Sequence, residues 1–350
     1  MKKILFALAL TVLATGSAMA QITLANDWKR TAAANTATPP DNIASNFFST
    51  TDNLTRGFDV NVSANKVYVV SRTNGNLVRI LNANTGADTG VTLVPPTGGY
   101  TGGTFLINKV GVADDNVIYV TNLALAAGVF NIYRHPDDTT AATAVHTVAS
   151  ADVRIGDDMA VKGSGNNTQI IVGGSAVSLS IFTTPDGGLT FNRTIVTPSN
   201  PAVSGIPSLA WDTTSGFWYR TSAGVGGLYT DAGVGGGQSA PRSTSSLYGP
   251  FDVATDFGTI ATPVYALSSG NVTAGNTIIQ GEIYAQSDLT TAVYVSDSVR
   301  PTGGTIGNGN AAGDVFIDSA NDRVYWLVTN NVIARDSIAP ADATDWNTYF

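Results

Sequence analysis

Short runs of alternating or β-branched residues, separated by Gly, Asn, Asp or Pro, dominate the chain. The clearest example is Gly57–Leu81, which reads GFDVNVSANKVYVVSRTNGNLVRIL. This stretch contains an alternating run, a β-branched and aromatic run, and a third run that follows a Thr-Asn-Gly turn. Such a pattern predicts three short antiparallel strands joined by tight turns.

The same pattern recurs about every fifty residues, and the later units begin near INKVGV, DDMAV, PSLAW, PFDVAT and GDVFID. Four short strands in each repeat of this length are typical of β-propeller blades. We therefore predict an all-β protein, a single six-bladed β-propeller built of four-stranded antiparallel blades. A seven-bladed ring would need a further repeat within residues 21–55, and this alternative stays open.

Two columns of equivalent positions emerge when the units are aligned. The first strand of each unit carries a polar residue at one position, namely Asp59, Lys109, Asp158, Ser208, Asp252 and Asp314. The second strand carries a large residue, namely Tyr68, Tyr119, Ile171, Tyr219, Tyr265 and Tyr325. Small residues near the polar column suit a crowded innermost strand, whereas large side chains suit the wider gap between blades farther out.

Three segments divide the chain. Residues 1–20 are predicted to be a signal peptide, since Met1-Lys2-Lys3 precedes a short apolar run and Ser17–Ala20 offers a small-x-small cleavage site. Residues 21–55 form an N-terminal segment whose strand Ile22–Trp28 is expected to pair with the outer edge of the last blade. Residues 56–350 are expected to form the propeller domain.

Composition narrows the location and the partners. The signal predicts export from a bacterial cytoplasm to the periplasm, the extracellular space or the cell surface, and no second long apolar run predicts a membrane span. The chain has no cysteine, so disulfides and thiolate metal sites are ruled out. A net charge of −8 disfavours binding to nucleic acid or to anionic membranes, because both need a basic surface.

Two segments resemble a known repeat class. Lys66–Gly86 reads KVYVVSRTNGNLVRILNANTG, and Val117–Asn122 reads VIYVTN. They resemble the YVTN type of propeller repeat, although the turn Asn82–Gly86 lacks the usual Asp. The chain as a whole is similar to secreted bacterial propeller proteins of unassigned activity, so the resemblance implies a fold and no reaction.

Thr184–Phe191, which reads TPDGGLTF, resembles an Asp-box hairpin. The resemblance implies that Asp186 accepts hydrogen bonds within the turn of this hairpin, which begins at Thr184. It also implies that Gly188 supplies an unusual backbone angle and that Phe191 packs beneath. Asp-boxes of propellers are peripheral and structural, so this hairpin supports the fold more than any chemistry.

The polar column is the candidate ligand or ion site. Because innermost strands run along a central channel, Asp59, Lys109, Asp158, Ser208, Asp252 and Asp314 are expected in a ring near one mouth. Oxygen ligands in a ring could hold a hard cation such as Ca²⁺. Alternatively, the ring could only solvate the channel, with Lys109 pairing one Asp, or each Asp could cap a turn. We expect no cofactor, with Ca²⁺ as the alternative.

No complete catalytic set is visible. The histidines, His135 and His146, are expected on the surface or in hairpins of outer strands, and no Gly-x-Ser-x-Gly, HExxH or Walker motif occurs. Glu282, the single glutamate, falls in a third strand away from the channel. We therefore favour a non-catalytic secreted binding or surface scaffold module with a protein or glycan ligand. A metal-dependent hydrolase of the lactonase or esterase type at the channel mouth, and a self-assembling surface or filament protein, remain as alternatives.

Overall fold

A computed structural model of the chain describes residues 22–31, 42–44, 47–48, 54–174, 178–197, 205–206, 208–221, 226–229, 235–236, 251–273, 276–296, 312–329 and 332–338. The predicted signal peptide, Met1–Ala20, lies outside these residues. Within them the structure is almost entirely β, and the two helical elements are short 3-10 turns, Gly165–Asn167 and Ser319–Asn321.

Consecutive strands pair antiparallel into compact sheets along most of the chain. The first sheet consists of β3 (Phe58–Asn61), β4 (Lys66–Ser71), β5 (Leu77–Asn82) and β6 (Asp88–Thr92). The second consists of β7 (Phe105–Val112), β8 (Ile118–Leu123), β9 (Phe130–His135) and β10 (Thr143–Val148). The third consists of β11 (Ile155–Lys162), β12 (Gln169–Gly174), β13 (Leu179–Thr183) and β14 (Asn192–Val196).

Three further sheets follow in the same direction around the molecule. One consists of β15 (Ser208–Trp211), β16 (Phe217–Arg220), β17 (Gly226–Tyr229) and β18 (Gly235–Gly236). The next consists of β19 (Phe251–Ala254), β20 (Val264–Thr273), β21 (Asn276–Ala285) and β22 (Asp288–Val295). The closing sheet contains β23 (Ala312–Asp318), β24 (Arg323–Val328), β25 (Val332–Ile338), β1 (Leu24–Thr31) and β2 (Asn42–Ala44).

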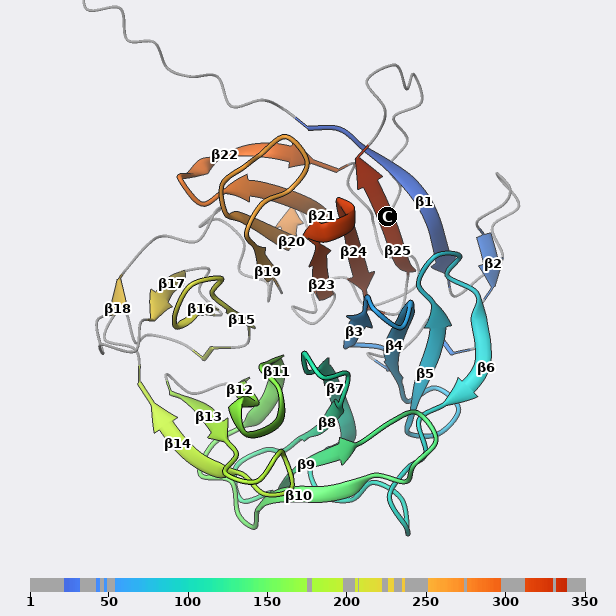
Figure 1. Ribbon diagram of the computed structural model, residues 1–350, viewed down its shortest axis with the longest axis vertical. Coiled ribbons are helices and arrows are strands. Elements are labelled where there is room, and N and C mark those ends of the chain that lie inside the picture. Colours follow the sequence, from blue (N-terminus) through green and yellow to red (C-terminus); the bar gives the residue numbers. More distant parts are fainter. Residues whose placement is uncertain are drawn as a thin grey trace, which may run out of the picture.

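The sheets stand radially around one axis, with β3, β7, β11, β15, β19 and β23 innermost (Figure 1). This arrangement confirms the prediction of an all-β propeller with four-stranded antiparallel blades. The finer prediction, six uniform blades of that kind, is wrong. Five sheets have this composition, whereas the closing sheet has five strands in the order β2-β1-β25-β24-β23. No seventh sheet occurs among the described residues.

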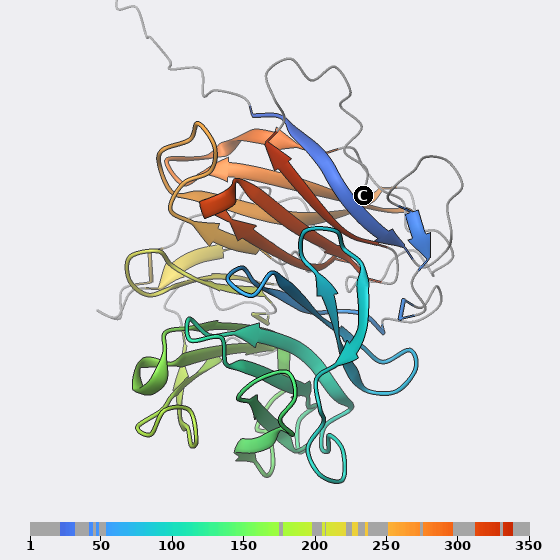
Figure 2. The ribbon, with the colours of Figure 1, turned by 45° about the vertical axis from the view of Figure 1, so that its right-hand side comes forward.

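Both ends of the described chain meet in the closing sheet. Strand β1 pairs antiparallel with β25, so that Leu24 lies opposite Ile338, and β2 adds a short parallel edge. Figure 2 shows β1 running along the outside of β25. The extra strand arises because β23–β25 fill only three positions and leave an outer edge unpaired, which an additional strand can cover.

The predicted aromatic column fills the space between blades. Tyr68, Tyr119, Tyr219, Tyr265 and Tyr325 all belong to the largest fully buried side chains. Nearer the axis the space is tighter, since a Cβ on Gly111 of β7 would lie 2.5 Å from Cγ2 of Val161 in β11. The change from small to large residues therefore follows the widening of the gap between neighbouring sheets.

Candidate functional site

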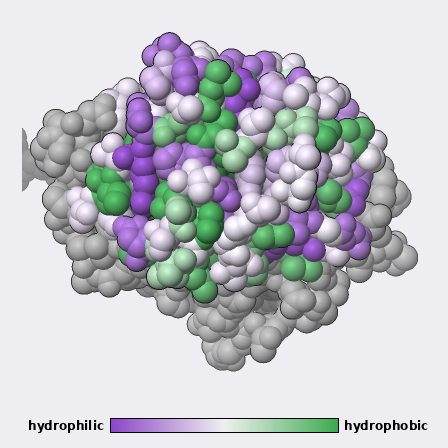
Figure 3. Space-filling view, turned by 90° about the horizontal axis from the view of Figure 1, so that it is seen from below, coloured by the Kyte–Doolittle hydropathy of each residue, from purple (hydrophilic) through white to green (hydrophobic). Residues whose placement is uncertain are grey.

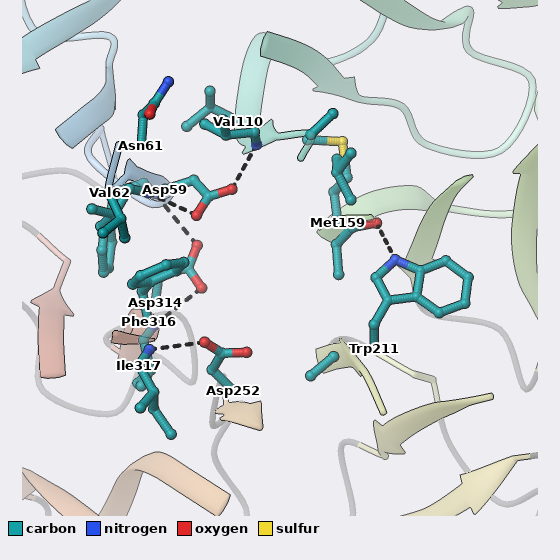
Figure 4. A pocket seen from close by; sticks show the side chains of 18 of the residues that line it. Asp59, Asn61, Val62, Val110, Met159, Trp211, Asp252, Asp314, Phe316 and Ile317 are labelled. Carbon is teal, nitrogen blue, oxygen red and sulfur yellow. Dashed lines mark hydrogen bonds between the residues drawn. The ribbon is translucent and has the colours of Figure 1, made fainter. Parts of the chain in front are cut away.

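A cavity of about 410 Å³ occupies the central channel. Residues from all of the innermost strands line it, including Asp59 of β3, Asp158 of β11, Asp252 of β19 and Asp314 of β23. Figure 4 shows Asp59, Asp314 and Asp252 on one side of this space and Trp211 on the opposite side. Its volume lies within the range of about 300–1,000 Å³ that is common for small-ligand sites.

Asp59 joins two neighbouring sheets. Its Oδ1 accepts a hydrogen bond from the backbone N–H of Val60 in its own strand, at 2.7 Å. Its Oδ2 accepts one from the backbone N–H of Val112 in β7, at 2.6 Å. The carboxyl therefore caps its own strand and holds the innermost strand of the next sheet.

The other aspartates of the column repeat this contact. Oδ2 of Asp158 accepts from the N–H of Leu209 at 2.8 Å, and Oδ2 of Asp252 accepts from that of Ile317 at 2.9 Å. Oδ2 of Asp314 accepts from the N–H of Phe58 at 3.4 Å, which joins the closing sheet to the first. Each of the four carboxyls thus links its own innermost strand to the next one around the ring. Equivalent positions of a repeat meet because each blade presents the same strand to the axis.

Lys109 bridges three sheets at the same level of the channel. Its Nζ lies 2.9 Å from Oδ1 of Asp158 and 2.9 Å from Oδ2 of Asp314, and it donates to the carbonyl of Gly313 at 3.3 Å. The side chain of Lys109 is 3% exposed. A cation is therefore already built into the column, and it forms ion pairs with two of the four carboxyls.

Burial shifts the pKa values of these groups. Burial raises the pKa of Asp59 to about 8, and the N–H groups of Val112 and Val60 offset part of this rise. Burial also raises the pKa of Asp252 to about 6 and, against the effect of Lys109, that of Asp314 to about 7. Burial lowers the pKa of Lys109, but the charges of Asp158 and Asp314 outweigh it, so the net shift is upward. Lys109 therefore stays protonated.

Most of the residues in the wall of the cavity are apolar, although polar atoms form the larger part of the surface exposed inside it. Val62, Val112 and Val161 line it with the larger side chains of Trp211 and Phe316. The indole N–H of Trp211 donates to the carbonyl of Ala160 at 3.2 Å, and Nζ of Lys162 lies 3.9 Å from the ring centroid. These contacts fix the orientation of the largest aromatic group in the wall.

The cavity brings together most of the predicted site residues. Asp59, Asp158, Asp252 and Asp314 line it, and Lys109 lies behind two of them. Ser208 is buried at the start of β15 but does not line the cavity. Among the described residues, no group of three His, Cys, Asp or Glu side chains is arranged to hold a metal ion. No pattern in the sequence identified Trp211 or Phe316 as residues of the cavity wall, because the repeat pointed only to its polar column.

The hairpin Thr184–Phe191 is held by its own side chains. Both oxygens of Asp186 accept from Thr190, with 2.8 Å to the backbone nitrogen and 2.7 Å to the hydroxyl. Gly188 has φ +85°, and a Cβ there would lie 2.1 Å from the hydroxyl of Tyr119. Phe191 is 5% exposed and packs edge-on against Tyr119. The membership of this hairpin in the Asp-box class stays a prediction.

The expected surface position of His135 is wrong. His135 is fully buried at the end of β9, and its Nε2 lies 3.0 Å from the hydroxyl of Tyr100. The polar Pro-Asp-Asp turn after His135 suggested a surface position for this histidine. The strand that contains His135, however, packs between two sheets. His146 is partly buried, with Nδ1 at 2.8 Å from the carbonyl of Phe191. Glu282 is buried too and accepts a hydrogen bond from the Tyr284 hydroxyl at 2.7 Å.

Radial sheets around a channel that contains a cavity define a β-propeller. No family model matches the sequence, and no curated protein matches it either. One similar solved structure is titled "Structure of U3-55K"; it is 7% identical, with a TM-score of 0.45, over 81% of this chain and 95% of that one. A likeness at this level carries no argument about function. Within the described residues, no helix is long and apolar enough to span a membrane.

Proposed function

We propose that the protein is an exported, non-catalytic binding module that receives a small ligand, or the end of a larger one, in its channel cavity. The closing sheet acts as the sixth blade of the ring in this proposal. The observation that carries it is the cavity of about 410 Å³, which is lined by valines, Trp211 and Phe316 together with a cluster of buried charged groups. Sites of this kind combine an apolar body with few, well-placed polar groups.

The carboxyls are better suited to positioning than to proton transfer. Each of the four aspartates already accepts a backbone N–H bond from the neighbouring sheet, and two of them also face Lys109. Proton exchange with a ligand would disturb contacts that hold the ring together. This argument favours a binding role over general acid–base catalysis.

Binding can be tested with small amphiphiles that match the cavity. Hexanol, hexylamine and hexanoate share one apolar body and differ only in the head group, so calorimetry with all three measures both occupancy and charge preference. Val62→Trp is expected to abolish binding, because Val62 lines the cavity and is 40% exposed. Val91→Trp is the matched control, since Val91 is 48% exposed on β6 and does not line the cavity. Failure of all three compounds to bind, or equal binding by both variants, would refute the proposal.

A hydrolase at the same cavity is the second candidate. The raised pKa of Asp59, about 8, favours it, because a carboxyl that is protonated near neutral pH can act as a general acid. Turnover of an ester or lactone panel that disappears in Asp59→Asn but persists in Asp137→Asn would establish the enzyme. Sensitivity of that turnover to a chelator would add the metal dependence.

Self-association is the third candidate. Val91, Leu189 and Ile195 are about half exposed or more on the outer parts of the blades. On the face drawn in Figure 3, however, hydrophobic residues are scattered among hydrophilic ones rather than gathered into one large patch. Sedimentation at increasing protein concentration tests this candidate, and a constant monomer mass would count against it.

A further inference from the structure

A second pocket of about 310 Å³ lies between the first sheet and the closing sheet. Its lining residues come from the turns that follow β3 and β5, from the end of β23, and from the following turn and β24; they are Val62, Asn65, Ala83, Asn84, Asp318, Asn321, Arg323 and Tyr325. Unlike the channel, this pocket is lined mainly by amide and charged side chains. It needs a separate explanation, because none of its polar groups belongs to the column of the innermost strands.

The walls of the pocket are fixed by contacts across the two sheets. The carbonyl of Ala83 accepts from Nε1 of Trp28 at 2.9 Å and from Nη1 of Arg335 at 2.7 Å. The side-chain carbonyl of Asn84 accepts from the same Arg335 nitrogen at 3.3 Å. Opposite them, Nδ2 of Asn321 donates to both oxygens of Asp318, at 3.1 and 2.9 Å. The pocket is therefore pre-formed rather than assembled by a ligand.

Several polar groups at this pocket retain hydrogen-bonding capacity. Within the described part of the chain, the only hydrogen bond of the Arg323 guanidinium is a long one, 3.5 Å to Oδ1 of Asn84. The side-chain amide of Asn65 makes none to another described residue, while its backbone carbonyl accepts from Ala83. The remaining N–H groups of the guanidinium and both ends of the Asn65 amide can thus serve a ligand.

The charges at the pocket balance. Arg323 and Asp318 lie opposite each other in the β23–β24 ladder and contribute one positive and one negative charge. A ligand with a strong net charge would gain from one of these groups and be repelled by the other. A neutral ligand that both donates and accepts hydrogen bonds can bind to Arg323 and to Asp318 at the same time.

From this lining we infer that the pocket is a binding site for a neutral polyhydroxyl ligand, a saccharide. Hydroxyl groups donate to Asp318 and to amide oxygens, and they accept from Arg323 and from amide nitrogens. The volume, about 310 Å³, reaches the lower end of the range for small-ligand sites. Val62 lines both cavities, so the saccharide site adjoins the channel without sharing its charged groups.

The inference is tested by saturation-transfer NMR and calorimetry on the full chain with maltose, cellobiose and lactose as neutral probes, and glucuronate and glucosamine as charged ones. The wild-type protein is expected to bind at least one neutral disaccharide more tightly than either charged sugar. Arg323→Gln should weaken that binding on the order of tenfold, because hydrogen bonds to a charged donor are lost. Asn65→Gly should weaken it by about fivefold, and glycine tolerates the φ of 56° at this position.

Arg193→Gln is the matched control, because Arg193 lies on β14, the outermost strand of another blade, where it pairs with Asp152. It should leave saccharide binding unchanged. Absence of binding by any neutral probe, preference for a charged sugar, or retention of binding in both pocket variants would overturn the inference. Hexanol binding in the channel should survive Arg323→Gln, so a failure of the saccharide site is distinguishable from a failure of the proposed function.

Discussion

Nζ of Lys109 lies 2.9 Å from Oδ2 of Asp314, although the two residues are 205 positions apart and belong to β7 and β23. The same nitrogen also pairs with Asp158 of β11. One buried ammonium thus connects three sheets around the channel. Because Asp158 and Asp314 also bind the backbone of the sheets that follow them, the ion cluster is continuous with the contacts that hold the ring.

Replacement of this ammonium should be costly. We expect Lys109→Met to reduce the free energy of unfolding by about 3–5 kcal/mol, because two buried carboxyls lose their cation. The loss should be smaller at pH 5 than at pH 8, since burial raises the pKa of Asp314 to about 7 and its protonation removes one of the unpaired charges. Urea denaturation at both pH values measures it. Lys66→Met is the control: Lys66 pairs with Asp138 near the surface, and its loss should cost at most about 1 kcal/mol. Equal losses in the two variants would contradict the buried-cluster explanation.

Calcium should not stabilise the wild-type protein. The position between Asp158 and Asp314 is filled by the Lys109 ammonium, which would repel a second cation. We expect the melting temperature to stay the same after addition of calcium or of a chelator. An increase with calcium that disappears in Asp158→Asn would instead reveal an ion site at the column.

Asp59 should make stability fall as the pH rises. Its pKa is about 8 in the folded protein and 3.8 in an unperturbed aspartate, so between these values the folded state holds the proton and the unfolded state does not. In that window the free energy of unfolding decreases by up to about 1.4 kcal/mol per pH unit from this group. Asp252 and Asp314, with pKa values of about 6 and 7, act in the same direction over narrower windows.

Chemical denaturation from pH 4 to pH 8 checks the effect of Asp59. Asp59→Asn should flatten the slope, although it also weakens one of the two backbone contacts and lowers stability at pH 4. Asp137→Asn is the control and should leave this slope unchanged, because hydrogen bonds from Thr139 and Thr140 lower the pKa of Asp137 and it stays charged in both states above pH 4. An unchanged slope in Asp59→Asn would show that the carboxyl ionises normally.

His135 should make the protein sensitive to acid. Burial lowers its pKa to about 4, whereas an unfolded histidine titrates near 6.5. As the pH falls from 6.5 towards 4, the unfolded state gains a proton that the folded state refuses, so stability is lost in this window. His135→Gln should reduce the loss. In the native protein, NMR titration of the His135 ring should show no midpoint near 6.5, and such a midpoint would contradict its burial.

Trp28 and Gly86 should be energetically coupled. A Cβ on Gly86 would lie 2.4 Å from the Trp28 ring, so Gly86→Ala should destabilise beyond the strain of its φ of +64°. Gly90→Ala is the matched control, since Gly90 has φ +75° but nothing within 4 Å. Trp28→Ala alone should cost about 3–5 kcal/mol. In the double variant the clash disappears, so the combined cost should be less than the sum; strict additivity would rule the contact out.

The repeat in the sequence was sufficient to predict the propeller fold and the burial of the aromatic column. It succeeded because each Tyr occupies the same buried position in its own blade, as Tyr68 and Tyr325 do. Strand Ile22–Trp28 was also expected at the outer edge of the last blade, and β1 lies there, paired with β25. The repeat was insufficient for the five strands of the closing sheet, because no local pattern reveals that β2 adds a short parallel edge to β1.

The polar column was visible in the sequence, but its contacts were not. The partner of Asp59 is the backbone of Val112, and a backbone N–H leaves no mark on residue type. The same holds for the second pocket, whose Asn84 and Arg323 lie 239 residues apart. In the sequence Asn84 is an ordinary polar turn residue and Arg323 an ordinary polar strand residue. They meet only because the closing sheet lies beside the first sheet.

The place of β1 beside β25 also sets the order in which the protein can mature. The side chain of Asn26 donates a hydrogen bond to that of Asp336, so β1 depends on a partner that is synthesised 310 positions later. Blades made of consecutive strands can form as the chain emerges, whereas ring closure must follow the arrival of residues 332–338. Until then, the edge of β1 that pairs with β25 has no partner, and a chaperone that binds extended segments could shield this edge.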